Sequence, residues 1–159
     1  MNKKLLAYNS IIGRIYCRIL DGYLTGLSIG KNDFPDVKEF ISLPFLKKEL
    51  DDYFHGKLYF FTQKIMFIEG TDFQRSVWHK LQSIRYGETV SYKAIAESLN
   101  MHGGYQAVGS ALSKNPIPII VPCHRVIGLD GSLVGFSSGL SIKRWLLNHE
   151  KRFKDYYKP

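Results

Sequence analysis

A proline-rich segment, residues 115–128, restricts its own backbone more than any other part of this 159-residue chain. It reads NPIPIIVPCHRVIG, with prolines at positions 116, 118 and 122. Proline lacks a backbone N–H and fixes φ, so these three residues exclude a helix. The β-branched run from Ile119 to Val121 then predicts a short buried strand. Cys123 is therefore expected at the end of a stiff, extended segment.

Two interpretations of Cys123 are open from the residues alone. The reactive form of cysteine is the thiolate, so a cysteine used for chemistry needs a base or a positive charge beside it, and His124 and Arg125 follow directly. The alternative is a small buried apolar residue that an incidental polar pair follows. Because adjacent side chains of a strand point to opposite faces, adjacency in sequence does not establish contact between Cys123 and His124.

The string from Pro122 to Val126, PCHRV, resembles the active-site signature of the O6-alkylguanine-DNA alkyltransferases, or methylated-DNA-protein-cysteine methyltransferases. The resemblance continues in order from Gly70 to Glu150, about half of the chain, without an evident gap. It includes the strings GTDFQ (70–74), YGETVSY (86–92), AVG (107–109), NP (115–116), GFS (135–137) and LLNHE (146–150). An ordered series of this length is far more specific than a match of five residues.

Composition sets limits on the fold and on the partners. With 45% apolar residues the chain has enough for a core, in one compact unit or two small packed ones. A formal charge of +8 favours a polyanion, either nucleic acid or an anionic membrane surface. No apolar run approaches a membrane span and the start is too polar for a signal peptide, so we expect an intracellular protein. Its two cysteines, Cys17 and Cys123, form neither a disulfide framework nor a metal cluster.

The first half of the chain predicts a scaffold without chemistry of its own. Strand-like stretches cover residues 11–20 and 23–29, with a hairpin signal at Asp21-Gly22 between them. Helical spacing of apolar residues covers 43–55 and ends at Gly56, and residues 58–68 return to strand-like composition. In the resembled family this part is a variable α/β domain packed against the reactive half.

The residue pattern in the second half of the chain predicts helices. Thr71 and Gln74 have the form of a capping box for a helix over 72–84, and Ser91 is the expected cap of a helix over 92–99. A glycine turn precedes a third helix over 105–114. Ser141 is the expected cap of a final helix, in which Lys143 and Arg144 face outward.

Two short helices joined by a glycine turn have two possible meanings. An ordinary helical hairpin is the commoner one, and a DNA-reading helix-turn-helix is the other. The positive charge and the resemblance favour the second. We therefore predict an α+β fold in which a small N-terminal antiparallel-sheet domain with a helix, residues 1–69, packs on a mainly helical C-terminal domain, residues 70–159, that contains a helix-turn-helix.

The residues also predict what kind of reaction is possible. The chain has no glycine-rich phosphate loop, no plausible zinc set and no cofactor fingerprint, so we expect no cofactor and no metal. An alkyl group on Cys123 must then come directly from the substrate. A thioether has no easy leaving path to water, which predicts a protein that is consumed once per lesion.

The resemblance implies a role for each matched residue. Cys123 is the alkyl acceptor, His124 takes its proton through a water molecule, and Glu150 orients the imidazole. Tyr92 donates a hydrogen bond to the guanine ring, and Asn115 ties the third helix to the strand. Base contacts are implied for Val126 and Ser137 through backbone groups, with Phe136 shaping the pocket. Contacts with the DNA minor groove are expected for Tyr105, Gln106, Ala107, Gly109, Ser113, Lys114 and Arg125, the last of which is also expected to support the fold.

Two positions depart from the family pattern. Gln106 stands where the family usually has an arginine that fills the gap left by the extruded base, which predicts slower repair unless Tyr105 or Lys114 compensates. Ser138 stands where many relatives have glycine, which predicts a narrower tolerance for bulky adducts.

The resemblance thus implies a DNA repair protein that transfers the alkyl group of O6-alkylguanine, with O4-alkylthymine as a further candidate, to Cys123 in one turnover with base flipping. We expect a monomer that binds double-stranded DNA, not membrane, in the cytoplasm, or in the nucleus of a eukaryote. Two alternatives stay open. One is a lesion-sensing DNA-binding protein that repairs nothing, and the other is a cysteine hydrolase with a Cys-His-Glu site.

Overall fold

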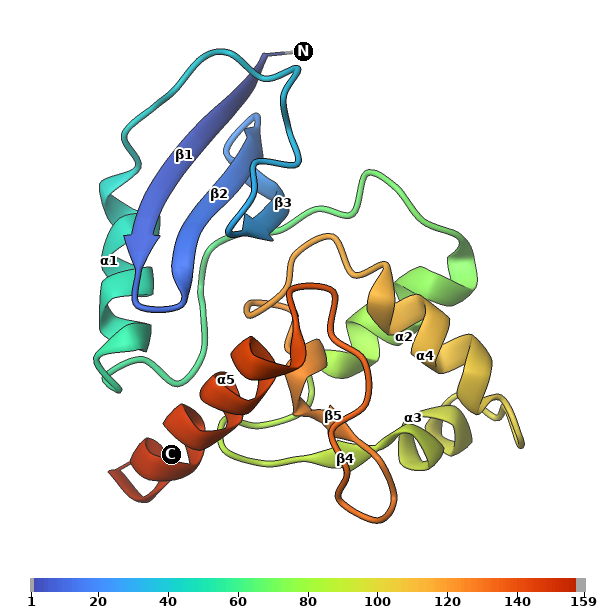
Figure 1. Cartoon of the computed structure of the whole chain (residues 1–159). Helices are drawn as coiled ribbons and strands as arrows, with labels where there is room; N and C mark the ends of the chain where they lie inside the picture. The colour runs from blue at the N-terminus through green and yellow to red at the C-terminus, as the bar shows by residue number, and fades with distance from the viewer. Residues whose placement is uncertain (1, 157–159) are drawn as a thin grey trace. The chain divides into compact units, whose positions relative to one another are not determined.

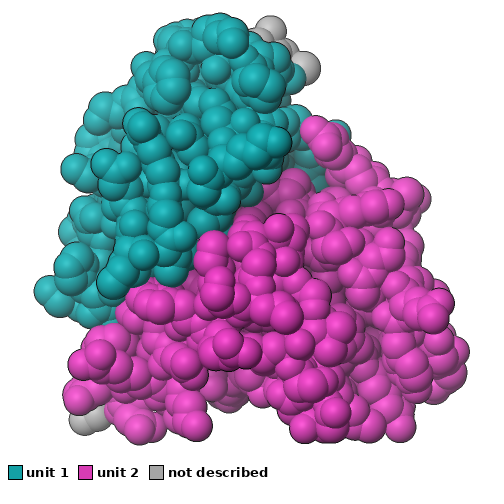
Figure 2. All heavy atoms as spheres, in the orientation of Figure 1, with its two compact units in different colours: residues 1–68 teal, residues 69–159 magenta. Residues whose placement is uncertain are grey.

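Three antiparallel strands form the sheet of the first of two units into which the chain folds, residues 1–68 and 69–159 (Figure 1, Figure 2). The strands are β1 (Lys3–Ser10), β2 (Gly13–Leu20) and β3 (Tyr23–Ile29), paired in chain order. The register sets Cys17 between Leu6 and Leu27. This computed structural model describes residues 2–156.

The turn between β2 and β3 is the hairpin that the sequence predicts. Leu20 pairs with Tyr23, so the loop has two residues, Asp21 and Gly22, with φ of 49° and 83°. Positive φ at both positions is the type of turn that matches the twist of the flanking strands, and it favours glycine and aspartate. The predicted strand over 11–20 is shorter than expected, because residues 11 and 12 form the turn that follows β1.

Helix α1 (Pro44–Phe54) buries one face, which carries Leu46, Leu50 and Tyr53. The strand-like segment over 58–68 is not a strand. Its backbone pairs with β3 in one isolated bridge, between Leu24 and Ile65. The carboxylate of Glu49 accepts the backbone N–H of residue 62 at 2.8 Å. A buried side-chain acceptor thus takes the place of a strand partner.

The second unit is mainly helical, as predicted. Its elements are α2 (Asp72–Leu81), β4 (Val90–Ser91), α3 (Tyr92–Ser98), α4 (Tyr105–Ser113), a 3-10 helix (Cys123–Arg125), β5 (Val126–Ile127), α5 (Leu140–Phe153) and a terminal 3-10 helix (Lys154–Tyr156) (Figure 1). The predicted capping box is present, because the Thr71 side chain accepts the Gln74 N–H and the Gln74 side chain accepts the Thr71 N–H. Among residues 2–156, no helix combines the length and the apolarity that crossing a membrane requires.

Helices α2 and α4 are tied together by one buried hydrogen bond. The indole Nε1 of Trp78 donates to the carbonyl of Ala111 at 2.8 Å, and Trp78 is almost fully buried. Val77 and Leu81 on α2 and Val108 on α4 are also buried. The bond fixes α4 on the core of this unit, so the opposite face of α4 is left for other contacts.

Candidate active site

The segment between α4 and Cys123 is a closed turn and not the predicted strand. The amide of Asn115 uses both ends, since Nδ2 donates to the Val121 carbonyl at 2.8 Å and Oδ1 accepts the Ile117 N–H at 3.0 Å. Ile119 lies in the left-handed region with a φ of 74°, which a β-branched residue rarely adopts. The strand prediction over 119–121 is wrong because the prolines remove ladder donors and Asn115 curls the backbone around its own side chain.

Cys123 opens a 3-10 helix, so the alternation of a strand does not apply to it and its neighbours. The three side chains of this turn, Cys123, His124 and Arg125, are all buried. Cys123 lines a pocket, while the other two reach inward to α5.

A buried ionic cluster joins this turn to α5. His124 and Glu150 share a hydrogen bond of 2.8 Å between Nε2 and Oε1, and Arg125 donates to both oxygens of the same carboxylate, each at 2.8 Å. The remaining Arg125 donor, Nη1, reaches the carbonyl of Ile84 at 2.6 Å, and the N–H of Gly87 donates to Glu150 at 3.2 Å. The bidentate pairing of arginine with carboxylate is among the strongest polar interactions in proteins.

The charge state of this cluster follows from its surroundings. Burial raises the pKa of Glu150, but His124 and Arg125 outweigh that effect and lower the pKa of this carboxyl far below its usual range, so it is an anion. Burial lowers the pKa of His124, so its ring is neutral at pH 7. A carboxylate can only accept a hydrogen bond, which assigns the ring proton to Nε2. Nδ1 is buried and makes no hydrogen bond with any group of residues 2–156, so its lone pair is free to accept a proton.

The thiol of Cys123 needs such a base. Burial raises the pKa of Cys123 to about 11, against the opposing influence of Asn115 and of the positive charge of Lys143. At neutral pH the sulfur is therefore a thiol, which is a poor nucleophile until a neighbour takes its proton.

Lys143 lies inside the unit, which corrects the prediction that it faces outward. Only 1% of its surface is exposed. Its Nζ donates to three carbonyls, those of Val126 at 2.7 Å, Val134 at 3.1 Å and Gly135 at 3.3 Å. Three acceptors offset the cost of burying the ammonium group.

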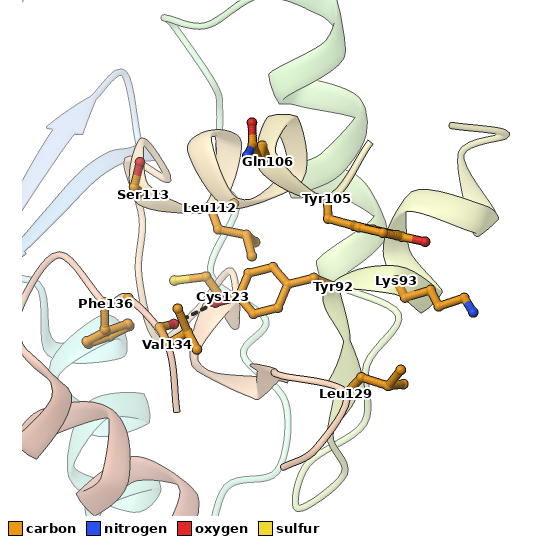
Figure 3. A pocket seen from close by; sticks show the side chains of 12 residues that line it. Tyr92, Lys93, Tyr105, Gln106, Leu112, Ser113, Cys123, Leu129, Val134 and Phe136 are labelled. Atoms are coloured by element: carbon orange, nitrogen blue, oxygen red, sulfur yellow. Dashed lines mark hydrogen bonds between the residues drawn. The ribbon is translucent and has the colours of Figure 1, made fainter. Parts of the chain in front are cut away.

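A pocket of about 640 Å³ opens beside the sulfur of Cys123 (Figure 3). Helices α3 and α4 form one side and the loop over residues 129–139 the other. Its lining is mostly apolar and aromatic: Tyr92, Lys93, Tyr105, Gln106, Gly109, Leu112, Ser113, Cys123, Leu129, Val134, Gly135 and Phe136. In the close view Tyr92 and Leu112 lie next to Cys123, with Val134 and Phe136 on the loop side (Figure 3). A volume of this size suits a small organic ligand or an extruded base.

Comparison with known proteins decides which family builds such a site. The model of the 6-O-methylguanine DNA methyltransferase, DNA binding domain, matches residues 72–152. The chain belongs to this methyltransferase family. The resemblance inferred from the sequence is thereby confirmed.

Relatives of this family are similar over different lengths. The methylated-DNA--protein-cysteine methyltransferase of Methanosarcina barkeri is 55% identical over 104 residues, 65% of each chain. The protein of the same name from Methanosarcina mazei is 47% identical over 120 residues, 76% of this chain and 74% of that one. The match thus spans just under two thirds of the first relative.

One solved structure covers almost the whole chain. It is the crystal structure of Mycobacterium tuberculosis OGT in complex with DNA, with a TM-score of 0.88 and 37% identity over 94% of both chains. This likeness, together with the mixed sheet and helix composition, confirms the predicted α+β fold class.

Several residues that the methyltransferase resemblance singles out meet at the pocket. They are Tyr92, Tyr105, Gln106, Gly109, Ser113, Cys123 and Phe136. Ser137 and Lys114 are exposed outside the lining, and Ala107 is half-buried. Val126 is buried, and its carbonyl accepts Nζ of Lys143. The hydroxyl of Tyr92 donates to the Val134 carbonyl at 2.6 Å.

A DNA contact was expected of Arg125, but its guanidinium group does not face the surface. Only 7% of this residue is exposed, and Nε, Nη1 and Nη2 all donate to protein acceptors. The expectation that Arg125 supports the fold agrees with these contacts. Its charge is used inside the protein to hold Glu150 as an anion.

The prediction missed Lys93, Leu112, Leu129, Val134, Gly135 and Lys143. Two of these carried a signal in the sequence. Leu112 follows Gly109 by three positions and so shares its helical face, and Lys143 shares the face of Leu146 and Glu150 in the same way. The loop residues Leu129, Val134 and Gly135 carried no periodic signal, because loops have none.

Proposed function

We propose that this chain is a DNA repair protein that transfers the alkyl group of O6-alkylguanine in duplex DNA irreversibly to Cys123. The observation that carries the proposal is the buried thiol of Cys123 on a pocket, followed in the same 3-10 turn by a neutral histidine that an anionic glutamate orients. Relatives named methylated-DNA--protein-cysteine methyltransferase support it, as does the complex of the similar Mycobacterium tuberculosis OGT with DNA.

The transfer begins with the thiol proton. Nδ1 of His124 accepts it, directly or through a water molecule, and the anion of Glu150 stabilises the imidazolium that forms. The sulfur then attacks the alkyl carbon, the S–C bond forms and the bond from carbon to O6 breaks. Its electron pair stays on the guanine, which takes up a proton and leaves as the unmodified base. No group in the pocket offers the thioether a route back, so each chain acts once.

The target base must leave the helix to react. Cys123 is 6% exposed, so its sulfur cannot reach a base that is stacked in a duplex. Extruding a nucleotide into a pocket solves this problem for enzymes that act on bases, at a cost of about a few kcal/mol. The open side of the pocket would admit the base, with the hydroxyl of Tyr92 as a donor to its ring.

Helices α3 and α4 are suited to hold the duplex as a helix-turn-helix. The exposed face of α4 carries Tyr105, Gln106 and Ser113, with Lys114 directly after it. The small side chains of Ser110 and Ser113 on this face suit the narrow minor groove, whose degenerate pattern of donors and acceptors would make binding largely independent of sequence. With a charge of +8 the affinity should fall steeply with added salt. Because all groups of the site come from one chain, a monomer suffices.

The decisive experiment incubates the protein with duplex DNA that contains one O6-methylguanine, and then weighs the intact chain and maps the modified peptide. We expect one methyl group per chain on Cys123, and none on the Cys123→Ser variant. A chain that binds the lesion tightly and stays unmodified would support a lesion sensor, and repeated turnover would support a hydrolase. Either outcome contradicts the proposal. The same assay with O4-methylthymine tests the second substrate.

A further inference from the structure

One backbone carbonyl, that of Val134, receives hydrogen bonds from two directions. The hydroxyl of Tyr92 on α3 donates to it at 2.6 Å, and Nζ of Lys143 on α5 donates to it at 3.1 Å (Figure 3 draws the first bond). Val134 lies in the loop that forms one wall of the pocket, with Gly135 and Phe136 after it. Two hydrogen-bond donors, from two different helices, therefore hold this wall of the pocket in place.

The two donors differ in how firmly they are held. Lys143 is almost fully buried and also donates to the carbonyls of Val126 and Gly135. Moving its ammonium group would leave a buried charge without hydrogen-bond acceptors, which costs free energy. Lys143 thus links the pocket wall to Val126, which lies three residues after Cys123. Its side chain cannot move elsewhere without a large cost in free energy. Tyr92 is held less firmly, because it is only partly buried and lines the pocket itself.

The hydroxyl of Tyr92 can donate one hydrogen bond, for which two acceptors compete. Burial raises the pKa of Tyr92, so the hydroxyl keeps its proton and acts as a donor. In the free protein the acceptor is Val134. In the proposed function the acceptor is the ring of the extruded guanine. One O–H cannot serve both at full strength, so a bound base takes the hydrogen bond away from the pocket wall.

We infer that Lys143 is a positioning residue, which holds residues 134–136 against Cys123 while the hydroxyl of Tyr92 turns from Val134 to the substrate. The inference rests on the proposed function for the identity of the substrate. The bond from Tyr92 is the exchangeable one, and the three bonds from Lys143 are permanent. A carbonyl oxygen has two lone pairs, so Val134 accepts both donors at first and keeps one when the base arrives.

Backbone ¹⁵N relaxation of the free protein tests this division without any reaction. In the wild type and in Tyr92→Phe we expect order parameters of about 0.8 for residues 134–136, because Lys143 still holds them. In Lys143→Met they should fall below about 0.6, and the double variant should equal Lys143→Met. The inference is wrong if Tyr92→Phe alone loosens the wall as much, or if Lys143→Met leaves it ordered.

Single-turnover kinetics test the consequence for transfer. Lys143→Met should lower the maximal rate of methyl capture roughly tenfold or more, because small displacements of a reacting pair are costly. The protein concentration at half-maximal rate should change less than about twofold. The matched control is Arg144→Met, which removes the same charge from the adjacent, exposed position of α5 and should keep the wild-type maximal rate. An unchanged maximal rate in Lys143→Met would overturn the positioning role.

The two proposals fail in different ways. If the wild type captures no methyl group, the repair function is wrong, whereas the relaxation data still report whether Lys143 orders the wall. If the wild type captures methyl and the order parameters of Lys143→Met match those of the wild type, only the positioning role is wrong. Binding of undamaged duplex and thermal unfolding of each variant establish that the variants are folded.

Discussion

Arg125 donates two hydrogen bonds of 2.8 Å to the two carboxylate oxygens of Glu150, and neither residue is exposed by more than 7%. The same carboxylate holds His124 at 2.8 Å. Arg125 supplies the positive charge that keeps Glu150 ionised, so the histidine can stay neutral. A buried triad of this kind contributes less to stability than its geometry suggests, but removing one partner leaves an uncompensated charge.

Replacing Glu150 by glutamine is therefore expected to destabilise the fold strongly. Glu150→Gln leaves Arg125 buried without an anion, which costs about 3–5 kcal/mol in comparable buried pairs. Urea unfolding measures the change. The matched control is Glu88→Gln at an exposed position of the same unit, where we expect less than about 0.5 kcal/mol. Equal losses in the two variants would contradict the role assigned to the buried carboxylate.

Stability should fall on acidification in two stages. The pKa of His124 is lowered in the folded protein from an ordinary value of 6.5, so the unfolded chain binds a proton there first and the free energy of unfolding declines below about pH 6.5. The pKa of Glu150 is also lowered, from 4.5, so its contribution, complete above that value, is lost as the pH falls further. Each group contributes a slope of at most about 1.4 kcal/mol per pH unit.

A variant assigns the first stage of this decline to one histidine. His124→Gln keeps a donor for Glu150 and has no titrating ring, so its unfolding free energy should fall less than that of the wild type between pH 6.5 and 5. Urea titrations at a series of pH values provide the comparison. Parallel curves for the two proteins would show that another of the five histidines causes the decline.

The amide of Asn115 should be worth more than one hydrogen bond. Asn115→Ala leaves the buried Ile117 N–H without its acceptor, at a cost of about 1–3 kcal/mol. It also removes one of the two donors to the Val121 carbonyl, which still accepts the N–H of Cys123 at 2.8 Å. Asn115→Asp retains the acceptor for Ile117 but sets a buried carboxylate oxygen against the Val121 carbonyl, so we expect a loss at least as large as that of Asn115→Ala. Urea unfolding of both variants tests the order. An exposed control, Asn148→Ala on α5, should change little.

Gln106 lines the pocket near the start of α4 and is exposed. If the proposed repair function holds, Gln106→Arg should raise the second-order rate of methyl capture from duplex DNA, because a wide cation fills the gap left by an extruded base better than a neutral amide. The gain should vanish on single-stranded DNA, where no gap forms. An equal gain on both substrates would instead indicate a general effect of charge on DNA affinity.

Local signals in the sequence predicted most of the fold. The capping box at Thr71 and Gln74, the turn at Asp21-Gly22 and the helical spacing of α1 each depend on residues within one or two turns of each other. The strand prediction over residues 58–68 was wrong because a contact distant in sequence decides the structure there. Their composition suits a strand, but the carboxylate of Glu49, thirteen residues away from Thr62, takes the hydrogen bonds that a neighbouring strand would have provided.

The site residues that belong to the family motif were predictable from the sequence. The positions that tertiary packing determines were less predictable. Cys123 and His124 were found by their string, but the turn at Ile119 was not, because one side-chain amide imposes a backbone that the β-branched residues oppose. Lys143 was expected to face outward, and Arg125 was expected to contact DNA as well as to support the fold. Composition cannot show that a carboxylate 25 residues away and three backbone carbonyls would draw these cations inside.

The acceptor at Val134 is a backbone carbonyl oxygen, and this affects what substitutions at the position can do. Substitutions at this position cannot delete the acceptor, so alanine scanning of the wall would report position 134 as unimportant even if the wall depends on it. Val134 is 53% exposed, so its side chain can be changed without loss of core packing. Substitutions at this position can thus reshape the entrance of the pocket while the attachment of residues 134–136 stays intact.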